Sequence, residues 1–131
     1  MPIKGIINLP GDKSISHRAL MLASLTDGEC VIHNLSTGDD VETTRNCLFQ
    51  CGIASSKEGA TVYIKGGTFK TPEKVLDCGN SGTSVRLLAG LLAGQGISAE
   101  FIGDNSLTQR PMNRIIDPLS QMGVHFKSNN G

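Results

Sequence analysis

The sequence predicts an α/β (α+β) fold built from a β-α-β-α-β-β unit that occurs twice. Short β-branched segments alternate with longer segments whose apolar residues recur at helical spacing, and glycines or prolines separate the two kinds. The two halves also match each other at a nearly constant offset. Arg18 and Arg86 lie 68 residues apart, and Gly52 and Gly123 lie 71 residues apart. A chain of 131 residues is long enough for one domain with a buried core.

The first repeat unit is expected over about residues 10–66, and a short strand at 3–9 leads into it. Asp39, with Glu42 three residues later, is typical of a capping box at a helix start, and Gly52 is typical of a helix end. The expected elements are, in order, a helix over about 16–26, a strand over 30–33, a helix over 39–51, and a hairpin with strands at 53–55 and 61–64.

The second repeat unit is expected over about residues 75–131. Pro111 suits the first position of a helix, and Pro118 should kink that helix or mark a restart at Asp117. Asn130-Gly131 is a hairpin turn signal with no return strand after it, so the chain is expected to be a fragment. The expected elements are a strand over 75–78, a helix over 83–93, a strand over 97–102, a helix from 111 with 112, 115, 116, 119 and 122 on one face, and a strand over 124–127.

Composition excludes several classes of function. Twelve basic residues balance twelve acidic ones and aromatic residues are scarce, so neither nucleic acid nor a membrane surface is an expected partner. The most apolar run, 85–93, is too short to span a bilayer. Cys30, Cys47, Cys51 and Cys78 form no C-x-x-C pair, which favours reduced structural thiols in a cytoplasmic protein over a metal site.

The loop before the first helix has the residue types of an anion site. Gly11 opens a turn that leads into a helix N-terminus, where free backbone N–H groups and the helix dipole favour an anion. Lys13 adds a charge, Ser14 a hydroxyl donor, and Arg18, one turn later, a planar guanidinium. Spacing alone fits ordinary capping by Ser14 or Ser16 equally well. The pattern is not a Walker A loop.

The same design recurs before the third helix, in residues 79–83. Gly82 allows close approach of a ligand to the backbone, and Asn80 and Thr83 offer polar contacts. The alternative is a Gly-Asn turn followed by a serine or threonine N-cap. Arg86 fits two roles, lining the same pocket or holding nearby backbone carbonyls.

Arg110 precedes the predicted N1 proline, where a cation is unfavourable unless it faces an anion or an acidic partner. An anion site explains it, and so does a salt bridge to Asp104 or Asp117. His17 lies beside the first loop, and a histidine whose pKa is unperturbed titrates near neutrality. No nucleophile or acid partner is visible for it, so no catalytic role is assigned to it.

Three blocks in this order carry a family resemblance: residues 9–18, residues 77–83, and residues 103–104 with 107–112. Together they resemble the N-terminal part of the 5-enolpyruvylshikimate-3-phosphate synthases. The resemblance implies an inside-out α/β barrel of two domains, each with three β-α-β-α-β-β units, of which this chain supplies about two. It also implies transfer of the enolpyruvyl group of phosphoenolpyruvate to shikimate 3-phosphate, with release of phosphate and no cofactor or metal.

The resemblance also assigns site residues. It places shikimate 3-phosphate on Lys13, Ser14 and Arg18, with Lys13 also reaching phosphoenolpyruvate. It places phosphoenolpyruvate on Asn80, Gly82 and Arg110, and Gly82 is the form that should admit the inhibitor glyphosate. The catalytic acid and base are expected on a missing C-terminal portion, so this chain alone should bind anions without catalysis. The alternative is a stand-alone or oligomeric anion-binding module.

Overall fold

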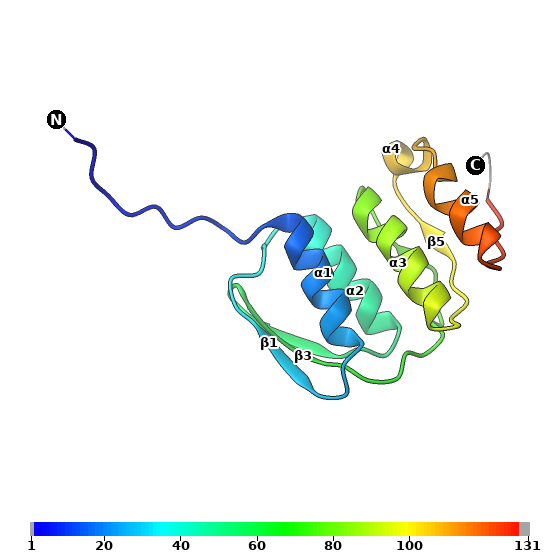
Figure 1. Ribbon diagram of the computed structural model, residues 1–131, viewed down its shortest axis with the longest axis horizontal. Coiled ribbons are helices and arrows are strands. Elements are labelled where there is room, and N and C mark those ends of the chain that lie inside the picture. The colour runs from blue at the N-terminus through cyan, green and yellow to red at the C-terminus, as the bar shows by residue number, and fades with distance from the viewer. Residues whose placement is uncertain (1, 129–131) are drawn as a thin grey trace.

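The computed structural model describes residues 2–128 as parallel helices packed against two small sheets (Figure 1). The helices are α1 (Lys13–Ser24), α2 (Asp39–Gln50), α3 (Gly82–Gly94), α4 (Asn105–Thr108) and α5 (Asn113–Gln121). The strands are β1 (Glu29–Ile32), β2 (Ser55–Glu58), β3 (Thr61–Lys65), β4 (Leu76–Asp77) and β5 (Phe101–Ile102). The mixture of helix and sheet agrees with the predicted α/β class.

The larger sheet is antiparallel, with the strand order β1-β3-β2. The predicted hairpin is present as β2 and β3, which turn at Gly59 with a positive φ of 59°. Its second strand lies where it was predicted, but the first is Ser55–Glu58 and not residues 53–55, so only Ser55 is shared. Side chains of β3 alternate as expected for a sheet with one covered face, because Val62 and Ile64 are buried whereas Tyr63 is 41% exposed. The buried face lies toward α1.

The smaller sheet consists of β4 and β5, which run parallel and pair Leu76 with Phe101 and Asp77 with Ile102. Parallel neighbours need a crossover connection, and α3 supplies it. The crossover brings the end of β4, where residues 79–81 begin the loop into α3, next to the end of β5, where α4 begins.

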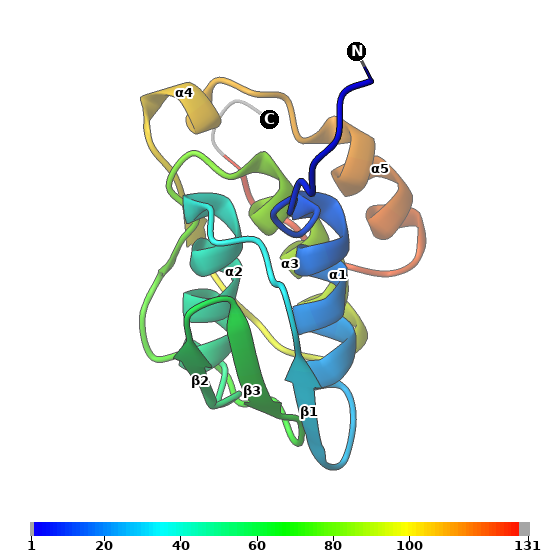
Figure 2. The ribbon, with the colours of Figure 1, turned by 90° about the vertical axis from the view of Figure 1, so that its left-hand side faces the viewer.

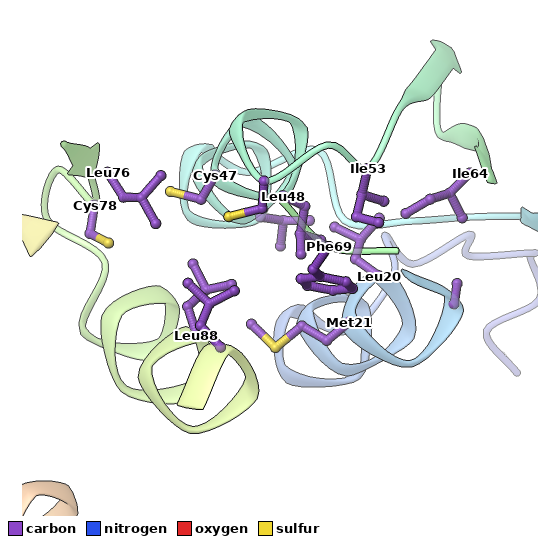
Figure 3. Close-up of a cluster of buried hydrophobic side chains, with 14 of the residues drawn as sticks. Leu20, Met21, Cys47, Leu48, Ile53, Ile64, Phe69, Leu76, Cys78 and Leu88 are labelled. Carbon is purple, nitrogen blue, oxygen red and sulfur yellow. The ribbon is translucent and has the colours of Figure 1, made fainter. Parts of the chain in front are cut away.

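The core lies between the helices and the sheets. Leu20 of α1, Leu48 of α2 and Leu88 of α3 are almost completely buried and meet there (Figure 3). Cys47 of α2 and Cys51, the C-cap of that helix, are fully buried, and both are free thiols. Burial raises the pKa of Cys51 to about 11, so its thiol stays protonated and packs as a small apolar group. No helix within residues 2–128 is long and apolar enough to cross a membrane.

Two predicted strands are absent from the structure. Residues 3–9 form no strand, and the segment leads away from the body with Ile3 101% and Ile6 91% exposed (Figure 1). Residues 124–127 form no strand either, and the strand predicted at 97–102 is reduced to its last two residues. A strand requires a hydrogen-bonded neighbour, and the described part of the chain places none beside these segments.

The capping box predicted at Asp39 is wrong. Asp39 already lies inside α2, the N-cap is Gly38, and no side chain caps this helix. The reason is that the carboxylate of Glu42 has other donors: Arg45 Nη2 lies 2.7 Å and Arg45 Nε lies 3.1 Å from its two oxygens. A carboxylate held by a guanidinium in this way does not turn back to the helix start.

The C-terminal part of the chain also differs from expectation. A short helix, α4, was not predicted; it begins because the Asp104 side chain accepts a hydrogen bond from Leu107 N at 2.8 Å. The next helix begins at Asn113, so Pro111 precedes it instead of occupying its first position, and it continues through Pro118, so no restart occurs at Asp117. The predicted turn at Asn130-Gly131 lies outside the described residues.

Candidate anion-binding site

Three helices begin at the same end of the molecule. In Figures 1 and 2, α1, α2 and α3 lie side by side, and all three start at the upper end of the view. Each start presents free backbone N–H groups and the positive end of a helix dipole, although three acids in the first turn of α2 offset the dipole of that helix. The residues that the sequence analysis selected all lie at or beside these helix starts.

The loop into α1 is fixed by a cap that the sequence analysis missed. The N-cap of α1 is Asp12, whose carboxylate accepts a hydrogen bond from Ile15 N at 2.8 Å. Ser16 is instead buried, where its hydroxyl donates to the Asp12 carbonyl and accepts from Ser36 N at 2.9 Å. The alternative that Ser14 or Ser16 caps the helix is therefore wrong, and the Ser14 hydroxyl remains exposed at the helix start.

The cations of this loop differ in their pairing. Lys13 Nζ lies 2.5 Å from a carboxylate oxygen of Asp40, in the first turn of α2. Arg18 is exposed, and no carboxylate within residues 2–128 lies in ion-pair range of it. Its guanidinium is thus available for an external anion, whereas Lys13 would share its charge between Asp40 and a ligand.

The loop into α3 is capped by Ser81, whose hydroxyl accepts a hydrogen bond from Ser84 N at 3.0 Å. The capping interpretation therefore holds for Ser81. The Asn80 side chain does not cap the helix and bonds to other side chains. Asn80 Nδ2 donates to both carboxylate oxygens of Asp104, at 3.2 and 3.1 Å, and Asn80 Oδ1 accepts from Arg110 Nη2 at 3.1 Å.

Arg110 makes neither of the salt bridges considered from the sequence. Within the described residues, no carboxylate oxygen of Asp104 or Asp117 lies in ion-pair range of Arg110. Asn80 stands between Arg110 and Asp104 and bonds to both. The backbone N–H of Leu107 holds the pKa of Asp104 below its usual value, and Asn80 and Arg110 lower it further. Asp104 therefore stays ionised and orients Asn80, while the Arg110 charge is not neutralised by direct contact.

Two guanidinium groups lie against Gly82. An ideal Cβ placed on Gly82 would lie 2.5 Å from Arg86 Nη1 and 3.0 Å from Arg110 Nη1. Arg86 also donates from Nη2 to the carbonyl of Pro111 at 3.3 Å, so it fills both roles proposed from the sequence. These two arginines, Pro111 and Arg114 line an open hollow of about 450 Å³.

Arg114 is a candidate that the sequence analysis missed. It lies in the first turn of α5, where a cation is electrostatically unfavourable, and the same rule had already identified Arg110. Three arginines around one hollow, with no carboxylate of the described chain in ion-pair range, form a strongly anion-attracting surface.

The six predicted residues thus form two groups. Asn80, Gly82 and Arg110 contact or closely approach one another at the start of α3, whereas Lys13, Ser14 and Arg18 lie on the first turns of α1. Asp40 joins the groups, since its carboxylate holds Lys13 and its backbone carbonyl accepts from Ser84 Oγ of α3 at 3.2 Å. From the sequence, Asp40 was one more acid beside a predicted N-cap, and nothing marked it as this link.

Comparison with known proteins gives a consistent result. The family model described as EPSP synthase (3-phosphoshikimate 1-carboxyvinyltransferase) matches residues 1–131. The 3-phosphoshikimate 1-carboxyvinyltransferase of Thermoanaerobacter sp. (strain X514) is 45% identical over 98% of this chain, and that of Streptococcus uberis is 48% identical over 96%. A solved structure of EPSP synthase from Acinetobacter baumannii superposes with a TM-score of 0.91 at 36% identity over 96% of this chain.

The match covers part of each relative. The chain spans 31% of the length of the Thermoanaerobacter protein and 29% of the solved Acinetobacter baumannii chain. The match nevertheless extends over the whole chain. It includes the starts of α1 and α3, which carry the candidate site and are called the two openings below. The chain therefore belongs to the EPSP synthase (3-phosphoshikimate 1-carboxyvinyltransferase) family.

Proposed function

We propose that this chain is the N-terminal, substrate-holding part of an enzyme that transfers the enolpyruvyl group of phosphoenolpyruvate to the 5-hydroxyl of shikimate 3-phosphate and releases phosphate. The observation that carries the proposal is the pair of guanidinium groups, Arg86 and Arg110, against Gly82 at the start of α3. Both substrates are polyanions, and charge-assisted hydrogen bonds from arginine are the strongest contacts available for phosphate and carboxylate.

Each of the two openings binds one substrate. Lys13, Ser14 and Arg18 bind shikimate 3-phosphate, because Ser14 and Arg18 lie one turn apart on one face of α1 and Lys13 lies at the start of the same helix. Asn80, Gly82 and Arg110 bind phosphoenolpyruvate, with Lys13 reaching across from α1. Because Gly82 has no Cβ, the guanidinium groups of Arg86 and Arg110 approach the buried start of α3 closely. The admission of glyphosate to the same position is part of this proposal.

The contribution of this chain to the reaction is electrostatic. Cations and helix starts hold two anions close together and offset the electrostatic repulsion between them. This repulsion is a large part of the free-energy barrier to joining two charged substrates. The chemistry also requires proton transfer to and from the reacting carbon and hydroxyl. No residue of this chain is proposed for that step, so we propose that the 131-residue chain binds anions without turnover, in a cytoplasmic setting.

Phosphate release tests this proposal. We expect no release when the 131-residue chain is mixed with both substrates, and release when a C-terminal portion from a family member is added. Shikimate 3-phosphate should bind to the chain in a calorimetric titration. Release by the chain alone would contradict the assignment of the catalytic groups to another portion.

An alternative function is a stand-alone or oligomeric anion-binding module. The complete arginine hollow and both capped openings are present within this chain, which favours independent binding. This alternative predicts the same affinity for shikimate 3-phosphate with and without the C-terminal portion, and no phosphate release from the mixture.

A further inference from the structure

A chain of buried hydrogen bonds crosses the three helices behind the two openings. His17 Nδ1 of α1 lies 2.7 Å from Thr44 Oγ1 of α2, and Thr44 Oγ1 lies 2.7 Å from Ser84 Oγ of α3. Ser84 Oγ also lies 2.7 Å from Ser81 Oγ, the N-cap of α3, and 3.2 Å from the Asp40 carbonyl. We call His17, Thr44, Ser84 and Ser81 the buried relay.

The direction of each hydrogen bond in the buried relay follows from counting protons. The Asp40 carbonyl has no proton, so Ser84 must donate to it, and Ser84 then accepts from Ser81. Because the single hydroxyl proton of Ser84 is used, Thr44 must donate to Ser84, and His17 must donate its Nδ1–H to Thr44. This order satisfies every contact and assigns His17 the Nδ1–H tautomer with a bare Nε2.

The buried relay is costly for a protein to maintain. His17, Thr44 and Ser84 are each 0% exposed, and His17 Nε2 has no hydrogen-bond partner within the described residues. Apolar side chains of similar size would fill this space without an unpaired polar atom. A buried polar network that satisfies all but one of its atoms fixes a single arrangement of the elements it joins.

Three residues in or bonded to the buried relay lie next to candidate anion contacts. His17 is adjacent to Arg18, Ser81 is adjacent to Gly82, and Asp40 holds Lys13. A shift of α3 relative to α1 would therefore break the buried relay and move both openings at once. None of the relay side chains needs to touch a ligand for this to occur.

We propose that His17 is a positioning residue whose neutral imidazole, through Thr44 and Ser84, holds the starts of α1, α2 and α3 in one arrangement, so that an anion bound at one opening strengthens binding at the other. This inference rests on the proposed function for the identity of the two anions, although the buried relay itself does not. Coupling of this kind is reciprocal, because each ligand stabilises the arrangement that the other requires.

Protonation of His17 should release this arrangement. The imidazolium would bury an Nε2–H with no acceptor, and burial lowers the pKa of His17 below its ordinary value. Asp40 on α2 opposes this effect and Lys13 on α1 adds to it, whereas α3 faces the buried relay with hydroxyl groups. The neutral form therefore persists at pH 7, and the coupling should disappear as the pH falls through the lowered pKa.

The first test requires no ligand. Long-range ¹H–¹⁵N spectra of the full 131-residue chain should show His17 protonated on Nδ1 and bare on Nε2. Amide hydrogen exchange at Ser84 and Val85, corrected for intrinsic rates, should accelerate as His17 becomes protonated. In His17→Asn, whose amide N–H replaces Nδ1–H and does not ionise, that acceleration should be absent. An Nε2–H tautomer would overturn the proposal. So would amide exchange rates at Ser84 and Val85 that do not change when His17 becomes protonated.

The second test measures the coupling. In calorimetric titrations at pH 7, phosphoenolpyruvate should strengthen shikimate 3-phosphate binding about fivefold or more. Thr44→Val, which keeps the shape but removes the hydroxyl, should abolish this factor, and Thr44→Ser should restore it. Coupling that survives Thr44→Val overturns the positioning role. Should neither substrate bind to the wild type, the proposed function fails, and the exchange experiment still decides the role of His17.

Discussion

Gly11 and Gly82 each open a candidate anion-binding helix, but the structure requires glycine at them for different reasons. A Cβ on Gly11 would overlap the backbone carbonyl oxygen of Asn34, which belongs to a segment held against α1 by the hydrogen bond from Ser36 N to Ser16. A Cβ on Gly82 would meet the ends of two flexible arginine side chains. Gly11 is therefore needed for folding, and Gly82 for the placement of charge.

Gly11→Ala should destabilise the fold, because the obstructing atom is backbone and cannot move aside cheaply. The expected loss in the free energy of unfolding is about 1–3 kcal/mol, typical of overpacking. Gly5→Ala is the matched control, since nothing lies within 4 Å of its ideal Cβ. Urea unfolding of both variants measures the difference, and equal stabilities would contradict the close packing at Gly11.

Gly82→Ala should weaken phosphoenolpyruvate binding and leave shikimate 3-phosphate binding nearly unchanged. The added methyl group pushes the guanidinium groups of Arg86 and Arg110 out of position, with an expected cost of about tenfold in affinity, or ~1.4 kcal/mol. Gly90→Ala, in the same helix and with nothing within 4 Å of its ideal Cβ, is the control. Calorimetry with each ligand separates the effects, and an equal loss for both ligands would argue against a local cause.

At the scale of single elements, α1 and α2 start in different ways. The cap of α1 is the Asp12 carboxylate, which is also an unfavourable neighbour for a bound anion. The start of α2 lacks a side-chain cap but carries three acids in its first turn, Asp39, Asp40 and Glu42. These acids balance the α2 dipole, so α1 and α3 remain the starts with free positive potential.

Asp12→Asn should separate the capping role of this side chain from its charge. Asparagine caps about as well as aspartate, so the free energy of unfolding should change little, whereas Asp12→Ala should lose about 1 kcal/mol. Both variants remove a negative charge beside Lys13, so shikimate 3-phosphate should bind more tightly to Asp12→Asn at low salt. Weaker binding by that variant would mean that the carboxylate itself contacts the ligand.

The Glu42 carboxylate pairs with Arg45 of the same helix and with Lys57 of β2, and it makes a pH-dependent contribution to stability. The Arg45 hydrogen bond is the main cause that lowers the pKa of Glu42. This stabilisation is present above the unfolded pKa and is lost as the pH falls through the lower folded pKa. Glu42→Gln should therefore cost less than about 1 kcal/mol at pH 7, and its difference from wild type should vanish in acid. A difference that grows on acidification would contradict this.

Helix positions were predictable from the sequence to within a few residues, but strands were less so. The apolar periodicity and the bounding glycines of α1, α2 and α3 are local signals, and they lie close to the observed bounds. Residues 3–9 and 124–127 contain β-branched or aromatic residues typical of strands. Pairing nevertheless decides whether such segments become strands, and pairing is not local. The capping box at Asp39 failed for a similar reason, because Arg45 competes for Glu42.

At the scale of the whole molecule, the candidate site depends on contacts between residues far apart in the sequence. The six candidate residues were predicted at helix starts, because the glycine, serine and charged residues that mark a helix start are neighbours in the sequence. The sequence could not show that Asn80 separates Arg110 from Asp104, or that Arg114 completes the hollow. The buried relay was equally hidden, since its partners lie 27 and 40 residues apart. The division into repeat units over 10–66 and 75–131 stays a prediction.

The parallel arrangement of α1, α2 and α3 is the feature of the whole molecule on which the proposed anion site depends (Figure 2). It gathers three helix starts near Arg18, Arg86, Arg110 and Arg114, none of which forms an ion pair within residues 2–128. Two anions can therefore be held near each other despite a chain with no net charge. Its direct test is the affinity of the 131-residue chain for shikimate 3-phosphate, measured by calorimetry at fixed ionic strength.

The decisive comparison is between wild type, Arg18→Ala and Lys57→Ala. Arg18 is unpaired in the described chain at the α1 opening, whereas Lys57 pairs with Glu42 on the sheet and serves as a control of equal charge change. We predict that Arg18→Ala weakens binding at least about tenfold, ~1.4 kcal/mol, and that Lys57→Ala leaves it unchanged. Equal affinities for all three proteins, or no binding by the wild type, would contradict the placement of the anion site at the shared helix starts.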